Sequence, residues 1–230
     1  MRTHLYRPVA EGHYPAIILY SEIYQITAPV RRTAEYLAGH GFFVVAPEVY
    51  HEFEELGTIF EYNEADTARG NELKTTKEMA SFDDDAAALV EYLKDHDSCT
   101  GKIGAMGMCL GGHLSYRACV TEPEIRAGVS WYGTDLAQRS LGKGGNDGTL
   151  DRTGEIQADM LMVWGRQDRH TTNDQRREIY DAMTDADITF AWHEFNAKHA
   201  FMRDIGARHD PEVANHVWSL TLSFFTRLLK

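Results

Sequence analysis

The sequence predicts a protein of the α/β class, with a doubly wound, mostly parallel sheet and helices on both faces. Two observations predict it. Short apolar runs alternate along the 230 residues with stretches of helical pattern, and this alternation is typical of βαβ units. The apolar runs are almost continuous, which favours strands that are covered on both faces.

The expected elements can be assigned in chain order. Six apolar runs are expected to be strands, at 16–20, 42–46, 103–107, 127–131, 160–164 and 188–195. Five helices are expected at 30–41, 81–96, 110–120, 173–185 and 211–230. The first helix follows Pro29 and ends at Gly41, and proline and glycine favour these two positions. We expect residues 1–230 to form a single domain.

Two stretches interrupt this alternation. Residues 48–75 are polar, acidic and weakly periodic. A long irregular segment in a compact domain is often functional, so this one is a candidate lid or substrate loop. Residues 133–155 are rich in glycine, but their GKGG lacks the spacing of a phosphate-binding loop.

Charge and composition narrow the possible partners. The formal net charge is −12, from 23 Lys and Arg against 35 Asp and Glu. Such a balance disfavours nucleic acids and anionic membranes. No apolar run approaches the roughly 20 residues of a membrane helix, and the first residues lack a signal-peptide core. The three cysteines show no disulfide spacing, so we expect a cytoplasmic protein with free thiols.

Residues 104–113, GAMGMCLGGH, carry the strongest chemical signal. An expected strand enters Gly-x-Cys-x-Gly and a helix follows, which is the context of a nucleophile elbow. The turn would hold the Cys109 thiol at a helix N-terminus, where backbone N–H groups favour a thiolate. The Leu110 N–H would face a developing oxyanion. A free cysteine can instead serve as a small buried hydrophobic residue. We adopt that interpretation for Cys99 and Cys119.

A thiol nucleophile needs a base and an acid that orients the base, and in this fold the acid precedes the base in the chain. Asp168 follows the strand expected at 160–164. His199 lies between the last expected strand and the last helix. Asp168 could instead cap a turn, and His170 is a rival for the base. No His or Cys spacing predicts a metal site.

With these residues in place, the chain resembles the dienelactone hydrolase family of α/β-hydrolases over nearly its whole length. The resemblance is carried by SEIYQI (21–26), GMCLGG (107–112), GRQD (165–168) and KHAFMR (198–203). It implies that Cys109 is the nucleophile, His199 the base and Asp168 its orienting acid. It also implies that Glu22 hydrogen-bonds the resting thiol. The N–H groups of Ile23 and Leu110 would form the oxyanion hole.

The resemblance is weaker around the substrate. Arg203 matches an arginine that helps to bind the substrate carboxylate in the family's type members. Arg69 is the candidate for a second arginine, and Trp131 and Tyr132 are candidates to line the pocket. Gln25 replaces a family glycine. Asn71 and Lys74 stand where aromatic residues would be expected.

We therefore expect a carboxylic ester hydrolase that cleaves small esters or lactones through a thiol-ester intermediate, without a cofactor or metal. Its expected partner is a small-molecule ester or lactone. Two alternatives stay open. The same thiol could serve a promiscuous carboxylesterase or a phosphoester hydrolase, or the chain could be a non-catalytic ligand-binding protein of the same fold.

Overall fold

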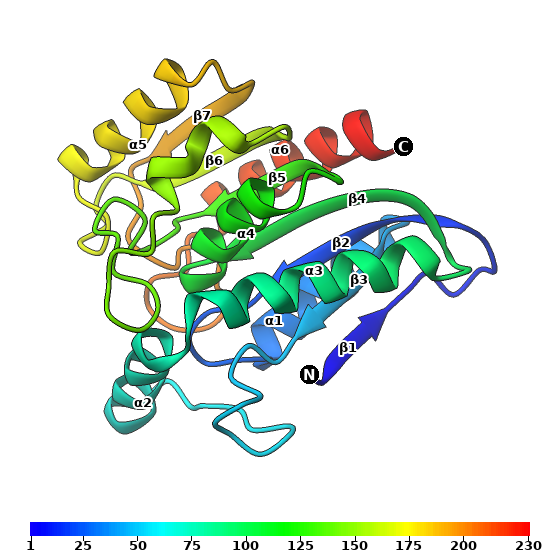
Figure 1. Ribbon diagram of the computed structural model, residues 1–230, viewed down its shortest axis with the longest axis horizontal. Coiled ribbons are helices and arrows are strands. Elements are labelled where there is room, and N and C mark those ends of the chain that lie inside the picture. Colours follow the sequence, from blue (N-terminus) through cyan, green and yellow to red (C-terminus); the bar gives the residue numbers. More distant parts are fainter.

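A computed structural model describes all residues, 1–230, and contains one seven-stranded sheet (Figure 1). The strands are β1 (Thr3–Tyr6), β2 (Tyr14–Tyr20), β3 (Phe43–Pro47), β4 (Cys99–Met108), β5 (Ile125–Trp131), β6 (Asp159–Gly165) and β7 (Phe190–Phe195). Their order in the sheet is β1-β3-β2-β4-β5-β6-β7. All neighbouring pairs are parallel except β1 and β3. The expected mostly parallel sheet is confirmed.

Helices cover both faces of this sheet, as predicted (Figure 1). One face carries α1 (Ala28–Gly39) and α6 (Pro211–Leu229), and the other carries α3 (Met79–Asp95), α4 (Leu110–Thr121) and α5 (Asn173–Asp185). The remaining helices are α2 (Glu64–Thr76) and a 3-10 turn, η1 (Leu150–Glu155). None of the helices combines the length and apolar character that a membrane span requires.

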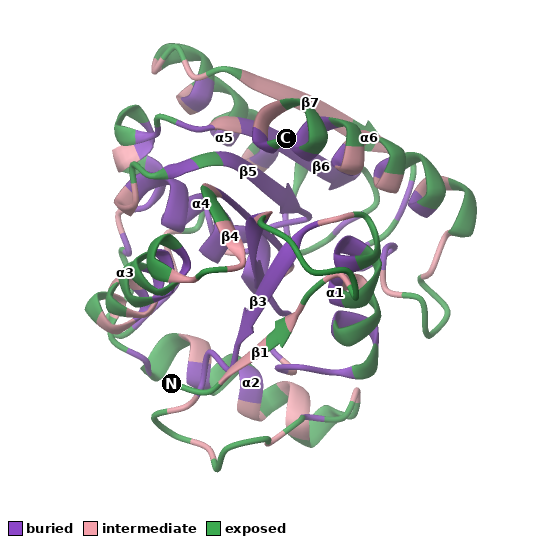
Figure 2. Ribbon diagram, turned by 90° about the vertical axis from the view of Figure 1, so that its right-hand side faces the viewer, coloured by how far each residue is buried: buried purple, intermediate pink, exposed green.

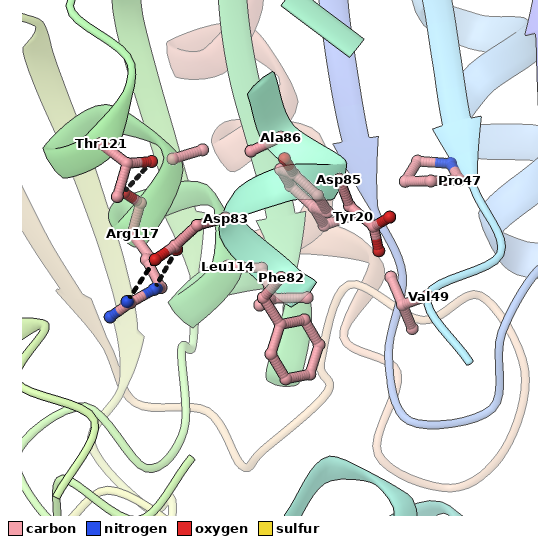
Figure 3. Close-up of a pocket in the computed structure, with 11 residues that line it drawn as sticks. Tyr20, Pro47, Val49, Phe82, Asp83, Asp85, Ala86, Leu114, Arg117 and Thr121 are labelled. Atoms are coloured by element: carbon pink, nitrogen blue, oxygen red, sulfur yellow. Dashed lines mark hydrogen bonds and ion pairs between the residues drawn. The ribbon is translucent and has the colours of Figure 1, made fainter. Parts of the chain in front are cut away.

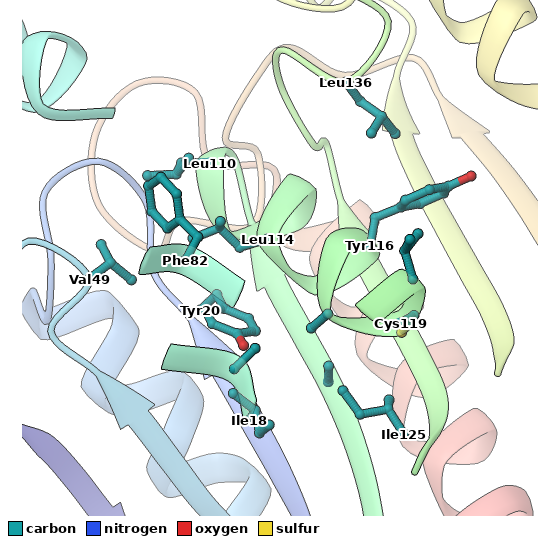
Figure 4. Packing of buried hydrophobic residues seen from close by; sticks show 14 of the residues in the cluster. Ile18, Tyr20, Val49, Phe82, Leu110, Leu114, Tyr116, Cys119, Ile125 and Leu136 are labelled. Atoms are coloured by element: carbon teal, nitrogen blue, oxygen red, sulfur yellow. The ribbon is translucent and has the colours of Figure 1, made fainter. Parts of the chain in front are cut away.

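The buried strands divide their side chains between two cores. Along β2, Ile18 and Tyr20 belong to the core under α3 and α4, whereas Ile17 and Leu19 belong to the core under α1 and α6. Successive side chains of a strand point to opposite faces, so both sets must be apolar. Figure 4 shows the first of these cores around Tyr20 and Leu114. Strand β3 is buried along its whole length, and β5 is buried except at Arg126 near its start (Figure 2).

Three elements were not predicted: the short turn η1, strand β1 and helix α2. Strand β1 has only four residues and pairs on one side alone, so it carries little apolar signal. Helix α2 lies within residues 48–75, which were expected to be irregular. The Asn63 side chain caps it by accepting a hydrogen bond from the Asp66 N–H at 2.9 Å. Only Gly70 and Leu73 of α2 are buried, which explains its weak periodicity.

The parallel arrangement determines where a site can form. The carboxyl ends of β2, β4 and β6 meet at one edge of the sheet, and the segments after them carry Glu22, Cys109 and Asp168. In open parallel sheets, ligands bind in the crevice outside these strand ends. Residues far apart in the sequence are therefore brought to one place.

Candidate active site

Cys109 occupies a strained turn between β4 and α4. Its backbone φ is 58° and its ψ is −121°, a conformation that non-glycine residues rarely adopt. A Cβ on Gly107 would lie 2.1 Å from the Gly111 carbonyl oxygen, and one on Gly111 would lie 2.2 Å from the Tyr20 carbonyl oxygen. The two glycines thus let strand and helix approach closely. The Cys109 N–H donates to the Trp131 carbonyl at 3.1 Å, which ties the turn to β5.

Asp168 and His199 form a buried hydrogen-bonded pair. The distance from His199 Nδ1 to Asp168 Oδ2 is 2.6 Å. The other carboxylate oxygen, Oδ1, accepts from the His170 backbone N–H at 2.7 Å. The carboxylate is thereby held from two sides and sets the orientation of the imidazole. His170 keeps its ring beside His199, with 4.5 Å between the ring centroids, but its side chain has no bond to Asp168.

The pKa of His199 depends on the neighbouring cysteine. Burial lowers the pKa of His199, but the negative charge of Cys109 and the hydrogen bond to Asp168 outweigh this effect and raise the pKa to about 10. The imidazole therefore holds its proton at neutral pH as long as the sulfur is a thiolate.

Glu22 lies beside this pair and is almost fully buried. Burial raises the pKa of Glu22, and the Arg203 guanidinium opposes the rise. Arg203 Nη1 donates to Glu22 Oε2 at 3.4 Å, and the guanidinium lies 4.2 Å from the centre of the Tyr62 ring. Arg203 is therefore already paired with a carboxylate within the protein.

The turn that carries Glu22 and Ile23 is held by Gln25, the residue that departs from the family pattern. Gln25 has a φ of 63°, the left-handed conformation that a glycine would adopt freely. Its side-chain amide donates to the Thr58 carbonyl at 3.0 Å and accepts from the Tyr50 N–H at 3.3 Å. These bonds fasten the turn to residues 48–75 and compensate for the missing glycine.

Two backbone N–H groups, those of Ile23 and Leu110, are predicted to form an oxyanion hole. Leu110 is the first residue of α4, so its N–H precedes the hydrogen-bond ladder of the helix. The Ile23 N–H has no hydrogen-bond acceptor within the protein. Helix α2 packs against this second residue through Gly70, where a Cβ would lie 2.6 Å from the Ile23 carbonyl oxygen.

These groups open into one pocket of about 620 Å³, here called the Cys109 pocket. Cys109, His199, Glu22, Ile23 and Arg203 all line it. The rest of its wall is mainly polar and comprises Tyr24, Tyr62, Asn63, Glu64, Thr67, Asn71, Lys74, Thr134, Asp135, Gln138, Arg169, His170 and Arg208. A second cavity, between α3, α4 and β2, has about 10 Å³ (Figure 3). It holds no more than a water-sized group.

Three of the residues expected to bind substrate lie outside the Cys109 pocket. Trp131 is buried on the α6 side, where its Nε1 donates to Thr221 Oγ1 at 3.2 Å. Tyr132 is fully buried and packs edge-on against the His199 ring. Arg69 forms ion pairs with Glu54 and Glu72 at 2.8 and 2.9 Å.

The geometry of α2 explains the position of Arg69. Thr67, Asn71 and Lys74 face the pocket at spacings of four and three residues, which is one side of a helix. Arg69 is two residues from Thr67, or roughly 200° around the helix, and so points away. Most residues of α2 are polar, so no stripe in the sequence indicated which side would form the wall. Arg169 and Arg208 lie in loops and had no periodic signal either.

One cluster has the composition of a metal site. Ligand atoms of His51, Glu52 and Asp85 lie within 4.8 Å of one another. The buried Lys77 ammonium lies 2.6 Å from Asp85 and 3.0 Å from Glu52, and it supplies these carboxylates with a positive charge. None of these residues lines the Cys109 pocket.

The sheet order, the strand–turn–helix at Cys109 and the helices on both faces define an α/β-hydrolase fold. A model of the dienelactone hydrolase family matches residues 1–229. A Saccharomyces cerevisiae protein, provisionally named carboxymethylenebutenolidase, is 34% identical over 100% of this chain and 88% of its own. The chain therefore belongs to the dienelactone hydrolase family.

Further relatives agree with this assignment. The carboxymethylenebutenolidase of Pseudomonas sp. strain P51 is 26% identical over 98% of this chain and 89% of its own. A Klebsiella pneumoniae structure, provisionally titled dienelactone hydrolase, superimposes with a TM-score of 0.86 at 25% identity, covering 97% of this chain and 92% of that one. The family and these relatives make this chain a hydrolase.

Proposed function

We propose that this protein hydrolyses small esters or lactones, with Cys109 as nucleophile, His199 as acid and base, and Asp168 as the group that orients the histidine. The observation that carries the proposal is the 2.6 Å bond between His199 Nδ1 and Asp168 Oδ2 on the wall of the pocket that Cys109 also lines. The carboxymethylenebutenolidase names of the relatives support a lactone or ester as substrate.

In the first half of the reaction, the Cys109 thiolate attacks the carbonyl carbon of the ester. The negative charge that forms on the carbonyl oxygen would be stabilised by the N–H groups of Ile23 and Leu110. The tetrahedral intermediate then collapses to a thiol ester, and the His199 imidazolium gives its proton to the leaving oxygen.

The second half of the reaction depends on how the pKa of His199 responds. Once Cys109 is a neutral thiol ester, the negative charge that did most to raise this pKa is gone. The pKa falls, so the neutral imidazole can take a proton from water, which attacks the thiol ester. The hydroxide ends in the carboxylic acid product, the C–S bond breaks to release the thiolate, and His199 again carries the proton that it had at the start.

Glu22 and Arg203 would act on the nucleophile and the substrate. A buried carboxylate next to the thiol disfavours a second negative charge, so Glu22 would restrain thiolate formation until a substrate enters. The ion pair with Glu22 occupies part of the Arg203 guanidinium. A substrate carboxylate at Arg203 would therefore compete with Glu22, and this competition would free Glu22 to act on the thiol.

Residues 48–75 would form the lid, since α2 supplies one wall of the pocket. A cytoplasmic location belongs to the same proposal.

The test is hydrolysis of p-nitrophenyl acetate and a panel of small lactones by wild type, Cys109→Ala and Cys109→Ser. We expect kcat/KM to fall by about a thousandfold or more in both variants, because the nucleophile is lost or no longer matched to its base. Cys99→Ser is the matched control, since Cys99 lies at the start of β4 and outside the pocket.

Mass spectrometry of quenched wild-type enzyme identifies the intermediate. An acyl mass on the peptide that contains Cys109 is expected. A phosphoryl adduct formed with phosphate esters, without any acyl adduct from carboxylic esters, would favour the phosphoester alternative. Full turnover by Cys109→Ala would remove the cysteine from the mechanism.

A further inference from the structure

A second pocket opens beside His199, and Glu22 is not among the residues that line it. It has about 380 Å³ and is lined by Gln167, Arg169, His170, Lys198, His199 and Arg208. We call it the cationic pocket. Its wall has three side chains that are positively charged at neutral pH, two imidazoles and one amide. It contains neither a carboxylate nor an apolar residue, which is unusual in a chain of net charge −12.

The three cations of this pocket have no partners within the protein. Most of the Lys and Arg side chains elsewhere form ion pairs, for example Arg32 with Asp204 and Arg117 with Asp83. Arg169, Lys198 and Arg208 form neither an ion pair nor a side-chain hydrogen bond, although the surface is rich in carboxylates. Unpaired like charges that share one pocket repel each other, so an anion there would be bound favourably.

The same segments that supply the catalytic pair present these cations. Arg169 directly follows Asp168, and Lys198 directly precedes His199. Arg208 lies in the loop before α6. That loop is closed by His209 Nδ1 on the Phe201 carbonyl, at 3.1 Å, and by the ion pair of Asp204 with Arg32. The backbone positions that carry the cations are therefore close in the chain to the reacting groups or lie in a loop that is closed by its own contacts.

The cationic pocket is continuous with the Cys109 pocket. Arg169, His170, His199 and Arg208 line both. The charge of Arg208 also reaches into both, because it adds to the burial that lowers the pKa of His170 and opposes the burial that raises the pKa of Glu22. One ligand can therefore place a carbonyl at Cys109 and extend an anionic group past His199.

We propose that the cationic pocket binds a phosphate group carried by the ester or lactone substrate. Two guanidinium groups and an ammonium supply more than enough positive charge for a phosphate dianion, and they offer donors for its three terminal oxygens. The absence of apolar lining excludes a hydrocarbon tail. This subsite differs from Arg203, which does not line the cationic pocket and is paired with Glu22. The inference rests on the hydrolytic function proposed above.

The experiment compares the acetyl ester of a short alcohol, neutral and phosphorylated at its far end, with acetate release as the readout. We expect wild type to prefer the phosphorylated ester, mainly through a lower KM. In the triple variant Arg169→Gln/Lys198→Gln/Arg208→Gln, the ratio of kcat/KM for the phosphorylated to the neutral ester should fall by about tenfold or more. The preference should also shrink with added salt.

Arg166→Gln is the matched control. It removes one positive charge from the same turn, but Arg166 lines neither pocket, so the ratio should keep its wild-type value. Inorganic phosphate should bind Cys109→Ala in calorimetry, and the triple variant made in Cys109→Ala should have lost this binding. The calorimetric readout does not depend on turnover.

Two results would overturn the subsite. One is equal kcat/KM for both esters in wild type. The other is an equal gain from a carboxylate in place of the phosphate, because the pocket would then recognise single negative charge only. If the proposed hydrolytic function is wrong, the result is different from either of these. Neither ester would be cleaved, but phosphate would still bind the Cys109→Ala protein.

Discussion

At the scale of single residues, the three cysteines differ in their surroundings. Burial raises the pKa of Cys99 to about 11 and that of Cys119 to about 12. Cys109 instead lies in a pocket with an imidazole whose pKa is raised to about 10. At neutral pH the other two thiols are therefore protonated, and Cys109 is the one cysteine that shares a pocket with an imidazole of raised pKa.

Asp168→Asn tests this residue-scale arrangement. Removal of the carboxylate charge lowers the pKa of His199, so the imidazolium loses its proton at a lower pH and the thiolate loses its partner. The rate at which iodoacetamide alkylates Cys109 at pH 7 should fall by about tenfold, and its pH profile should move to higher pH. Peptide mass mapping measures the rate site by site.

Cys99 and Cys119 are internal controls in the same sample and should stay slow in both proteins. An unchanged rate at Cys109 in Asp168→Asn would show that the carboxylate does not reach the thiol through His199.

At the scale of elements, the elbow is a packing arrangement as much as a catalytic one. Gly107 and Gly111 allow β4 and α4 to meet the end of β2 at distances that a methyl group would block. Helix α2 meets the Ile23 turn in the same way through Gly70. The segments that carry the Leu110 and Ile23 N–H groups, the proposed oxyanion donors, thus lie in close backbone contacts.

Gly111→Ala measures this close packing. Its Cβ would lie 2.2 Å from the Tyr20 carbonyl oxygen, which is backbone and cannot rotate away. We expect a loss of about 1–3 kcal/mol in the free energy of unfolding, measured by urea titration. Esterase kcat should fall as well, because α4 and the Leu110 N–H must move.

Gly39→Ala is the control for that substitution. Gly39 lies in α1, and nothing comes within 4 Å of its added Cβ. Alanine there should leave kcat at the wild-type value and stabilise the protein by up to about 1 kcal/mol. Equal stability of Gly111→Ala and wild type would contradict the packing argument.

At the scale of the whole molecule, two cores on opposite faces hold the sheet while its carboxyl edge carries the site. Trp131 illustrates the division. Its backbone carbonyl accepts the Cys109 N–H, whereas its side chain packs edge-on against Trp218 and bonds Thr221 in α6. The side chain thus supports the α6 face and is remote from the pocket wall.

Trp131→Phe should therefore reduce stability without changing substrate binding. The smaller ring leaves a cavity and an unpaired Thr221 hydroxyl, at a cost of about 1–3 kcal/mol. A chain of this size should then melt about 2–10 °C lower. KM for p-nitrophenyl acetate should match that of wild type. Tyr92→Phe, at an exposed aromatic residue, should change neither quantity.

A clear increase in KM for p-nitrophenyl acetate in folded Trp131→Phe would contradict this prediction. It would show that the Trp131 side chain contributes to substrate binding. Thermal melting followed by circular dichroism, together with steady-state kinetics below the transition, distinguishes the two results.

Local sequence patterns determined most of the secondary structure and the position of the Cys109 turn. Apolar runs and helix signals predicted the parallel strands and five of the helices, because burial and helix propensity act over a few residues. The Gly-x-Cys-x-Gly turn placed Cys109 between β4 and α4 for the same reason. The order of Asp168 and His199 in the chain was also readable, since each follows a strand.

Only the tertiary structure decided which side chains share a pocket. Whether Arg69 or Lys74 faces the cysteine depends on the rotation of α2, which its polar sequence does not encode. Arg169, Lys198 and Arg208 lie in loops, and their convergence depends on the order of strands in the sheet. The physical reason is that secondary structure follows from neighbouring residues, whereas a site follows from packing between segments that are distant in the chain.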